Sequence, residues 1–413
     1  MKRVIIHSDM NSCYASIECS LNPELRGKAV AVGGSVEDRH GIILAKSEEA
    51  KKCGVKTGEV IWQAKQKCPE LIVVPPHFEQ YMKYSELAHQ IYSRYTDKIE
   101  PMGLDEVWCD ITGSIMAFGS ARKICDEIRE AFRSELGITV SIGLSFNKTF
   151  AKLGSDLAGR DEVFEITEGN FKEKVWNLPA RAIFGIGPRT GEKLHFYGID
   201  TVRQLAMTSP EWLKLTFGVA GDDMWRKANG LDYSAVNTDG QSVPVKSVGH
   251  GITCVADLTT SEEVWKVMLS LCQDVSRRLR KAHLEATAVQ ISVRDNKLIT
   301  RQFQCRTAYE TQSASEIAKT AFELFEKNYI WNCNIRSVSV TAIGLQPENT
   351  PVQLEMSGDY KKHENQKKID DTVMELRRRF GENSIFNCCL MMEEKIPQHK
   401  EKLPIPFMRR RQE

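Results

Sequence analysis

The sequence predicts an α+β protein built from several domains. Up to about residue 167, short apolar runs typical of strands alternate with amphipathic segments of helical period. A helical stretch punctuated by glycines follows, and a second alternation of strands and helices begins after residue 245. The chain has 413 residues, and because a domain typically takes about 150 residues, we expect about two to four domains.

Two predicted strands carry the acidic residues on which the functional interpretation depends. Pro101–Thr112 is rich in strand-forming residues and contains Asp105 and Glu106, and the apolar run that opens Val4–Tyr14 ends in Asp9. Side chains alternate between the two faces of a regular strand, so Asp105 and Glu106 can share a site only at a strand end, a hairpin or a bulge. An adjacent Asp–Glu pair is more often a solvated surface pair, but the position of these acids beside apolar strands favours a site.

If these two strands pair, the carboxylates of Asp9, Asp105 and Glu106 converge. Three carboxylates at close range repel one another. A divalent cation relieves that repulsion, and oxygen ligands suit Mg²⁺ or Mn²⁺. The small polar residues after Asp9 are typical of a chain that turns around a bound anion.

The first part of the chain is predicted to form one sheet domain with an insertion at about 20–77. Within the insertion, Ser47 caps a short helix, Glu48–Cys53, which stops at Gly54. The basic residues beside and within this helix are either a solvated face or a phosphate site, and the pattern leaves both open. The other predicted elements are strands at 29–34, 41–45 and 139–144 and helices at 81–99, 115–136 and 147–157.

Beyond residue 168 the glycines mark a candidate DNA-binding turn. The stretch 184–194, followed by 197–205, has the pattern of a helix–hairpin–helix. Gly185 and Gly187 would expose backbone N–H groups at a helix start, which suits a DNA phosphate. A simple tight turn is the alternative, and the second helix in register favours the DNA interpretation.

A polar stretch at 232–245 predicts a linker to the last domain. The span 246–345 then follows the order strand, helix, strand, strand, helix, strand. Its excess of basic residues is slight, so DNA binding would depend on one face that carries arginines, and solvated charge is the alternative. The candidate DNA-binding residues here are Arg294, Arg301 and Arg336.

The end of the chain and the overall composition add limits. After residue 346 one helix, 370–380, is predicted, and the rest of 346–413 is expected to be partly disordered. The net charge is +1, so whole-chain charge does not indicate nucleic acid, although charges can gather on one face. The 12 cysteines show neither a CxxC pair nor a metal-ligand spacing, which predicts reduced thiols in a cytoplasmic protein. No stretch is long and apolar enough to cross a membrane.

Four motifs stand in one order along the chain. They are DMNSCYASIE at 9–18, AKKCGVKTG at 50–58, GLDE at 103–106 and SIGLSFNKTFAK at 141–152. Together they resemble the Y-family translesion DNA polymerases of the DinB/UmuC type, and the resemblance runs from residue 1 to about 345. Four motifs in this order are far more specific than a single Asp–Glu pair.

The resemblance implies a right-hand polymerase. Its segments are a catalytic palm at 1–19 and 78–167, fingers at 20–77, a helical thumb with the helix–hairpin–helix at 168–231, a linker at 232–245, a DNA-binding little finger at 246–345 and a C-terminal tail at 346–413.

The resemblance also implies the roles of single residues. Asp9, Asp105 and Glu106 would be catalytic and hold two Mg²⁺ ions, with Mn²⁺ as the alternative ion and the Met10 carbonyl as a further ligand. Tyr14 would be the steric gate, whose ring clashes with a ribose 2′-hydroxyl. The implied nucleotide-binding residues are Asn11, Ser12, Cys13, Tyr14, Lys51 and Arg160.

Several positions depart from the family pattern. Cys13 stands where relatives usually have Phe, and Glu48 where they usually have a Tyr that contacts the triphosphate; an anion there repels a nucleotide unless it turns away. Lys51 keeps a charge without the bidentate geometry of Arg, and Arg160 stands one position late relative to the family's Lys-Pro. Gln353–Met356 lacks the aromatic residue of the family's clamp-binding motif, so a sliding clamp is a candidate partner with a degenerate motif only.

These features predict a template-directed, low-fidelity DNA polymerase for translesion synthesis in DNA repair. Its partners would be primer–template DNA and deoxynucleoside triphosphates, and we expect a cytoplasmic monomer. The first alternative is a catalytically weakened DNA-binding homologue with a regulatory role, suggested by the altered nucleotide contacts. The second is another palm-type enzyme, such as a nucleotide cyclase, which has no need of a helix–hairpin–helix or a separate basic domain.

Overall fold

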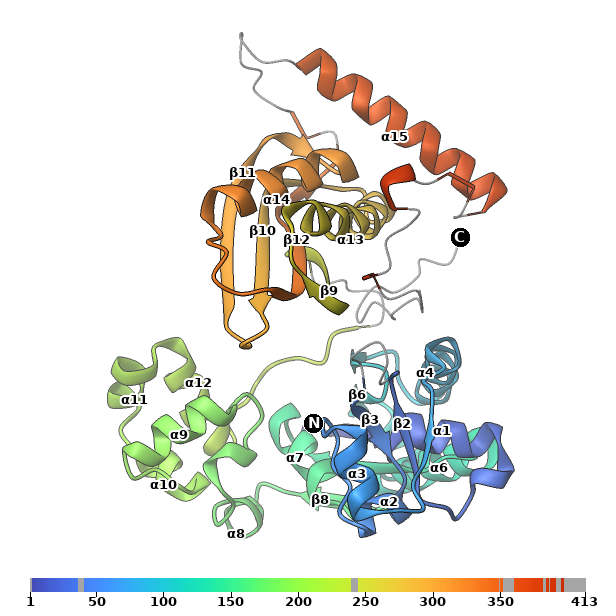
Figure 1. Cartoon of the computed structure of the whole chain (residues 1–413). Helices are drawn as coiled ribbons and strands as arrows, with labels where there is room; N and C mark the ends of the chain where they lie inside the picture. Colours follow the sequence, from blue (N-terminus) through green and yellow to red (C-terminus); the bar gives the residue numbers. More distant parts are fainter. Residues whose placement is uncertain are drawn as a thin grey trace. The chain divides into compact units, whose positions relative to one another are not determined.

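A computed structural model describes residues 2–35, 41–238, 244–348, 350–351, 360–381, 384–385, 387–390 and 395–396. The chain forms two compact units (Figure 1). The first lies within Met1–Gly34 and Ile42–Gln241, and the second mainly within Ser242–Lys400. The candidate clamp-binding stretch Gln353–Met356 lies outside the described residues.

The first unit is organised around a five-stranded sheet of order β5-β6-β1-β7-β8. Strand β1 (Ile5–Met10) is almost entirely buried because it pairs antiparallel on both sides, with β6 (Glu106–Asp110) and β7 (Val140–Ser145). Strand β5 (Ile99–Met102) is antiparallel to β6, and β8 (Val163–Ile166) is parallel to β7. The helices that share the core of the sheet or pack on it are α1 (Cys13–Leu21), α4 (Phe78–Tyr92), α6 (Ala121–Ala131) and α7 (Lys148–Leu157).

Two predicted helices and one predicted turn need correction. The helix predicted at 81–99 ends at Tyr92, because Ile99 is already paired with Cys109 in the sheet. The helix predicted at 115–136 is interrupted at Gly119, whose φ of 96° is outside the helical region, and it ends in a π-helical turn at Phe132–Leu136. The turn expected after Asp9 is short, and helix α1 follows it at once with one apolar side buried.

The insertion predicted at 20–77 contains a small three-stranded sheet of order β3-β2-β4. Strand β2 (Val30–Gly33) is antiparallel to β3 (Ile43–Lys46) and parallel to β4 (Ile72–Val74). This sheet has a hydrophobic cluster separate from that of the five-stranded sheet.

Two helices flank the small sheet. Helix α2 (Glu48–Lys52) begins as the sequence predicts, because the Ser47 hydroxyl accepts a hydrogen bond of 3.3 Å from the Ala50 amide. Gly54, with φ of 83°, follows its end. Helix α3 (Ile61–Lys67) packs its Ile61 and Ala64 into the same cluster.

A helical region completes the first unit. Its buried cluster includes Leu194, Val202, Leu205 and Leu213. Its α-helices are α8 (Phe171–Val175), α9 (Pro188–Phe196), α10 (Val202–Met207), α11 (Pro210–Phe217) and α12 (Val219–Ala228).

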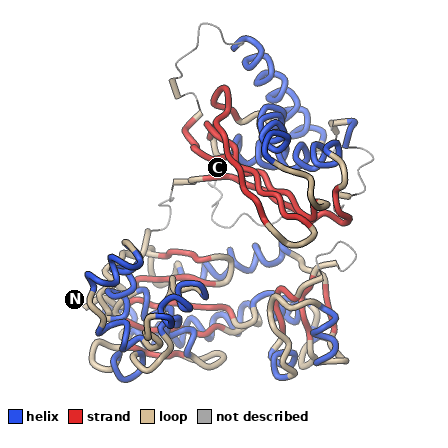
Figure 2. Tube along the Cα trace, turned by 60° about the vertical axis from the view of Figure 1, so that its left-hand side comes forward, coloured by secondary structure: helices blue, strands red, loops and turns tan. Residues whose placement is uncertain are grey.

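The second unit is a four-stranded antiparallel sheet of order β11-β10-β12-β9, covered on one side by helices (Figure 2). Its order of strands and helices is the one predicted for 246–345. The elements are β9 (Ser247–Leu258), α13 (Ser261–Lys281), β10 (Leu284–Asp295), β11 (Thr300–Thr311), α14 (Ala314–Asn328) and β12 (Ile335–Pro347).

Helix α15 (Tyr360–Phe380) is longer than the predicted 370–380 and ends at Gly381, whose φ is 96°. It is joined to the second unit by ion pairs, of which Lys367 to Glu285 spans 2.9 Å. Within the described ranges, no helix has the length and apolar character needed to cross a bilayer.

Candidate active site

One end of the central sheet brings the three predicted acidic residues together. In the antiparallel pair of β1 and β6, Asp9 lies directly opposite Glu106, so the two side chains share a face. Asp105 precedes β6, and its carbonyl oxygen accepts a hydrogen bond of 3.0 Å from the Met10 amide. The two acidic strands therefore pair, which is the condition on which the proposed site depends.

The side chain of Asp105 does not follow the alternation of side chains along a regular strand, because Asp105 lies in a turn before β6. The turn requires Gly103, whose φ is 79°. The Asp105 Oδ1 atom lies 3.4 Å from the place that a Cβ atom on Gly103 would take. The ligand oxygens of the three acids do not all lie within 4.8 Å of one another, so the carboxylates are neighbours that are not gathered around one point.

Lys152 is the residue of this site to which the sequence assigned no role. Its Nζ atom lies 2.8 Å from Glu106 Oε1, 3.0 Å from Asp156 Oδ1 and 3.8 Å from Asp9 Oδ2. The side chain is largely buried, so its charge acts on the carboxylates with little screening by water. It provides a positive charge that partly compensates the acids.

Close packing of α7 on β7 places Lys152 there. A Cβ atom on Gly143 would lie 1.9 Å from the Ala151 carbonyl oxygen, and one on Gly154 would lie 2.9 Å from the Gly143 Cα. Both positions therefore need glycine, because helix and strand backbones touch. A lysine within the otherwise small and apolar stretch 149–155 of this helix was the available sequence signal.

The environment of the site shifts the pKa values of Asp9 and Glu106 in opposite directions. Burial first, and then the charge of Glu106, raise the pKa of Asp9 to about 7. Burial also acts to raise the pKa of Glu106, but His7 and Lys152 outweigh it and lower that pKa to about 2. His7 is itself buried, which lowers its pKa, and its Nε2 atom lies 3.6 Å from Glu106 Oε2, too far for a hydrogen bond.

These residues fit a divalent cation. The Glu106 Oε2 atom is buried and has no hydrogen-bond partner among the described residues. Burial, and then the charges of Glu106 and Asp105, raise the pKa of Asp9, and the Lys152 ammonium already acts as a counter-charge. Carboxylate and carbonyl oxygens are the ligands that Mg²⁺ and Mn²⁺ prefer.

Asp9→Asn is expected to stabilise the metal-free first unit. Because folding raises the pKa of Asp9 from 3.8 to about 7, ionised Asp9 destabilises the fold above pH 4, and this cost grows until about pH 7. The side chain is 30% exposed, so we expect a gain of about 1–2 kcal/mol at pH 8 after allowance for solvent screening.

Thermal melting in a chelator at pH 8 and pH 5 measures this effect. The difference between Asp9→Asn and wild type should shrink at pH 5, where wild-type Asp9 is already protonated. The control is Asp156→Asn, which removes a carboxylate that also pairs with Lys152. A lower melting temperature for Asp9→Asn would contradict the raised pKa.

The turn after β1 presents backbone N–H groups at the start of α1. Ser12 has a left-handed φ of 51° and no side-chain cap bond is made there. The Asn11 side chain fixes the turn. Its Nδ2 atom donates a hydrogen bond of 2.8 Å to Ser141 Oγ, and its Oδ1 atom accepts one of 3.1 Å from the Asp161 backbone N–H. A helix N-terminus with uncapped N–H groups suits a phosphate. The Asn11 N–H is not free for this role, because it donates 3.0 Å to the Thr139 carbonyl oxygen, which leaves Ser12 and Cys13 as the candidates.

The Tyr14 ring is held in place by a second aromatic ring. It stacks on Tyr81, with centroids 4.2 Å apart and planes 8° apart. The Tyr81 hydroxyl donates a hydrogen bond of 2.5 Å to buried Glu18, which also contacts His77 Nδ1 at 2.9 Å. The Tyr14 ring is therefore held in a fixed position. Burial raises the pKa of Tyr14 to about 12, so the phenol is neutral.

Glu48 faces the turn that follows β1. The Ser12 hydroxyl donates 3.4 Å to Glu48 Oε1, and Lys51 Nζ lies 3.8 Å from Glu48 Oε2. The Glu48 carboxylate therefore pairs with Lys51 but does not turn away from the turn, because it also remains beside Ser12. Arg160 is exposed, and its Nε donates 3.4 Å to Thr139 Oγ1.

The glycines of the predicted hairpin precede α9. Gly185 has φ of 99°, and Gly187 is the residue before the helix, without a side-chain cap bond. Lys227 Nζ donates 3.4 Å to the Phe184 carbonyl oxygen, which puts a cation beside the hairpin. The N–H groups and the cation together suit a phosphate.

In the second unit, the structure separates the candidate arginines. Arg294 pairs with Thr300 across β10 and β11, so Arg301, the next residue, points to the opposite face. Arg301 lies on the helix-covered face, 3.7 Å from buried Asp295 and over the ring of Tyr329. Arg336 is half-buried at an irregular step of β12.

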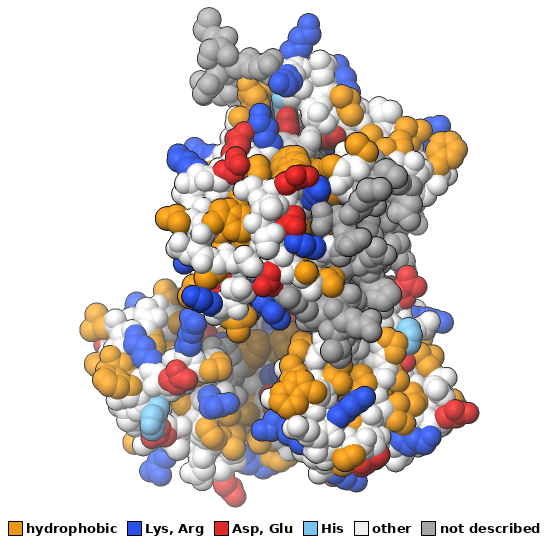
Figure 3. All heavy atoms as spheres, in the orientation of Figure 1, with side chains coloured by type: hydrophobic (Ala, Val, Ile, Leu, Met, Phe, Trp, Pro, Cys, Tyr) orange, Lys and Arg blue, Asp and Glu red, His pale blue; other side chains and the backbone are white. Residues whose placement is uncertain are grey.

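Arg306 shares the face of Arg294 by register and is exposed. The neighbouring residues of that face are polar and include Gln290, Ser292 and Gln304. On the face drawn in Figure 3, basic and acidic side chains are interspersed over the second unit. Phosphate contacts on the sheet face of Arg294 and Arg306 would therefore depend on single arginines among polar side chains.

Family models match both units. The model described as the impB/mucB/samB family matches residues 8–156, and the one described as the impB/mucB/samB family C-terminal domain matches residues 245–356.

Curated relatives match over most of their length. DNA polymerase IV of Acetivibrio thermocellus is 44% identical over 393 residues, covering 95% of this chain and 98% of that protein. DNA polymerase IV 1 of Bacillus subtilis is 34% identical over 396 residues, covering 95% of this chain and 94% of that protein. Among solved structures, a Y-family DNA polymerase chimera superposes with a TM-score of 0.75 at 21% identity, covering 84% of this chain and 100% of that one.

Proposed function

The chain belongs to the impB/mucB/samB family, the Y-family DNA polymerases of the DinB type, and from this premise we propose how its residues extend a primer past damaged template bases. It is a DNA-directed DNA polymerase of translesion synthesis, acting on primer–template DNA and deoxynucleoside triphosphates. The observation that carries the proposed site is the register of β1 and β6, which sets Asp9 opposite Glu106 with Asp105 beside them.

Asp9, Asp105, Glu106 and the Met10 carbonyl are proposed to hold two divalent cations, Mg²⁺ or Mn²⁺. Such ions polarise the primer 3′-hydroxyl and offset the charge that develops on the phosphoryl group. Lys152 holds Glu106 by a hydrogen bond of 2.8 Å and keeps it ionised. Glu106 is therefore already ionised and can bind a cation without first losing a proton.

The turn at Asn11–Cys13 is proposed to receive the triphosphate on the N–H groups of Ser12 and Cys13, because the Asn11 N–H already donates to the Thr139 carbonyl oxygen. Tyr14 lies beside that turn and would exclude a 2′-hydroxyl by its bulk. Lys51 and Arg160 are proposed to contact the phosphates. Lys51 would have to leave Glu48 to do so.

The alternatives find less support. The relatives that match over nearly the whole chain are named as DNA polymerases, which gives no support to a solely regulatory homologue. A nucleotide cyclase would not account for the match of the second unit to the family's C-terminal domain. The monomeric state, and a sliding clamp as a candidate partner with a degenerate motif, stay predictions.

Primer extension with Mg²⁺ on an undamaged template and on one with an abasic site tests the function. Extension on both templates is expected. Failure of the wild-type protein on both, with intact DNA binding, would favour the regulatory homologue.

Glu48→Gln is expected to lower the apparent Michaelis constant for the nucleotide about threefold to tenfold. One like charge at ~6 Å and an effective dielectric of ~20 costs roughly 3 kcal/mol before screening, and pairing with Lys51 removes part of it. Steady-state single-nucleotide kinetics measure the effect. Glu49→Gln, on the same helix, is the matched control, and an unchanged or higher constant for Glu48→Gln would mean that Glu48 serves to hold Lys51.

Arg294→Ala is expected to weaken DNA binding equally on all sequences and to reduce the salt slope by about 0.9, the loss of one phosphate contact. Arg301→Ala should instead destabilise the second unit by ~1 kcal/mol, because buried Asp295 loses a partner. Fluorescence anisotropy at several salt concentrations and thermal melting separate the two outcomes. Loss on one sequence alone would point to base readout by Arg294.

A further inference from the structure

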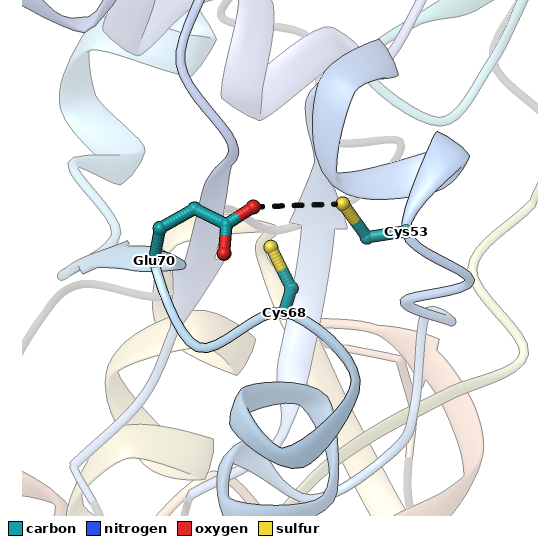
Figure 4. A group of neighbouring side chains, drawn as sticks. All are labelled: Cys53, Cys68 and Glu70. Atoms are coloured by element: carbon teal, nitrogen blue, oxygen red, sulfur yellow. Dashed lines mark hydrogen bonds between the residues drawn. The ribbon is translucent and has the colours of Figure 1, made fainter.

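Three side chains in the small three-stranded sheet region form a second cluster of potential metal ligands. One ligand atom each from Cys53, Cys68 and Glu70 lies within 4.8 Å of the other two, and no other such group occurs among the residues the structure describes. Figure 4 shows the two sulfur atoms and the carboxylate pointing toward one another. Cys68 is buried, Cys53 half-buried and Glu70 exposed, so the cluster opens to solvent on the Glu70 side.

Two helix ends hold the cysteines in place. Cys53 is the residue that ends α2, and Cys68 the residue that ends α3. The Lys67 ammonium donates 3.2 Å to the Gly54 carbonyl oxygen and so joins the two ends. The Leu71 amide donates 3.0 Å to the Cys68 carbonyl, which turns the chain back and brings Glu70 over the sulfur atoms.

We propose that Cys53, Cys68 and Glu70 bind a thiophilic divalent cation, and that Zn²⁺ is the ion this donor set fits best. Zn²⁺ takes Cys sulfur at about 2.3 Å and carboxylate oxygen at about 2.0–2.2 Å in tetrahedral sites, so its ligand atoms stand roughly 3.5–3.8 Å apart. The Cys53 Sγ to Glu70 Oε1 distance is already 3.9 Å. Water would take the fourth position.

The binding step balances in protons. The Cys53 Sγ–H already points at the Glu70 carboxylate, 3.9 Å from its Oε1 atom. On binding, the two thiols release their protons to water, and the cation takes the place of those protons between the two sulfur atoms and the carboxylate.

A disulfide between Cys53 and Cys68 is the competing outcome. It would need an oxidant and a sulfur–sulfur distance of about 2.05 Å, and it would give Glu70 no part. The convergence of a carboxylate with both sulfur atoms favours a cation. The site lies in a hydrophobic cluster different from that of the five-stranded sheet, so it is separate from the acids Asp9, Asp105 and Glu106.

Metal titration of the full chain tests the proposal. Cys388 and Cys389 are exposed neighbours and are first replaced by Ser to remove an adjacent thiol pair. The chelator-stripped protein, kept in a phosphine reductant, is titrated with Zn²⁺ against a chromophoric chelator. Co²⁺ replaces Zn²⁺ as a probe, because sulfur-to-cobalt absorption reports thiolate ligands.

One equivalent of Zn²⁺ is expected, with an absorption of two thiolates in the Co²⁺ form. Cys53→Ser should lose the tight site, Glu70→Gln should weaken it at least about tenfold, and Cys19→Ser, a half-buried thiol elsewhere, should leave it unchanged. Glu70 is exposed, so its variant keeps the test valid if a cysteine variant fails to fold. The proposal would be overturned if the parent protein bound no Zn²⁺, or if Cys53→Ser and Glu70→Gln bound it as tightly as the parent. A Cys53–Cys68 disulfide that forms on mild oxidation, in a protein that binds no Zn²⁺, would show that the pair serves as a disulfide instead.

Discussion

Primer extension is expected to fall by about 10³-fold or more in Glu106→Gln and in Asp105→Ala, with primer–template binding nearly unchanged. Removal of one group that stabilises charge in a transition state typically costs about 10²–10³-fold, and each of these acids is proposed to act there. Glu106→Gln keeps the shape of the side chain but removes the negative charge that is proposed to bind a cation. It also leaves Lys152 with Asp156 and Asp9 as its partners.

The matched control for this prediction is Glu100→Gln. Glu100 lies on β5, next to β6, and its carboxylate accepts 2.6 Å from Lys148 instead of facing Asp9. Single-turnover extension and DNA anisotropy, with a melting curve for each variant, measure chemistry, binding and folding separately. Extension by Glu106→Gln at the rate of Glu100→Gln would remove Glu106 from the site.

The strands of the site were predictable because their pattern is local. Apolar runs that end in acids identified β1 and β6, and pairing of the two strands is a short step from there. That Asp105 and Glu106 could share a site needed an irregularity, which is the turn at Gly103. The sequence allowed this irregularity without specifying it.

The contacts made across the fold were less predictable. Lys152 reaches the acids only because Gly143 and Gly154 let the backbones of α7 and β7 touch. A local sequence pattern does not specify how closely a helix packs on a strand. Arg294 and Arg301 looked equivalent in the sequence, and the strand register sent them to opposite faces. Cys53 and Cys68 showed no recognised ligand spacing, yet two helix ends bring them together with Glu70.

Tyr14→Ala is expected to raise the efficiency of ribonucleotide insertion about 100-fold, equivalent to ~2.7 kcal/mol, with little effect on deoxynucleotides. The barrier is strong because the ring cannot easily swing aside: it stacks on Tyr81, which Glu18 holds through a hydrogen bond of 2.5 Å. Bulk rather than charge sets the barrier, because the phenol of Tyr14 has a raised pKa and is neutral.

Two further variants separate the ring from its support. Tyr14→Phe keeps the ring and should keep the discrimination against ribonucleotides. Tyr81→Phe removes the hydrogen bond to Glu18 and should lower that discrimination by a few-fold only. Single-nucleotide insertion kinetics with matched ribo- and deoxyribonucleotides give all three values. If Tyr14→Phe admitted ribonucleotides as readily as Tyr14→Ala, the hydroxyl and not the bulk of the ring would exclude them; if neither did, the gate would be another residue.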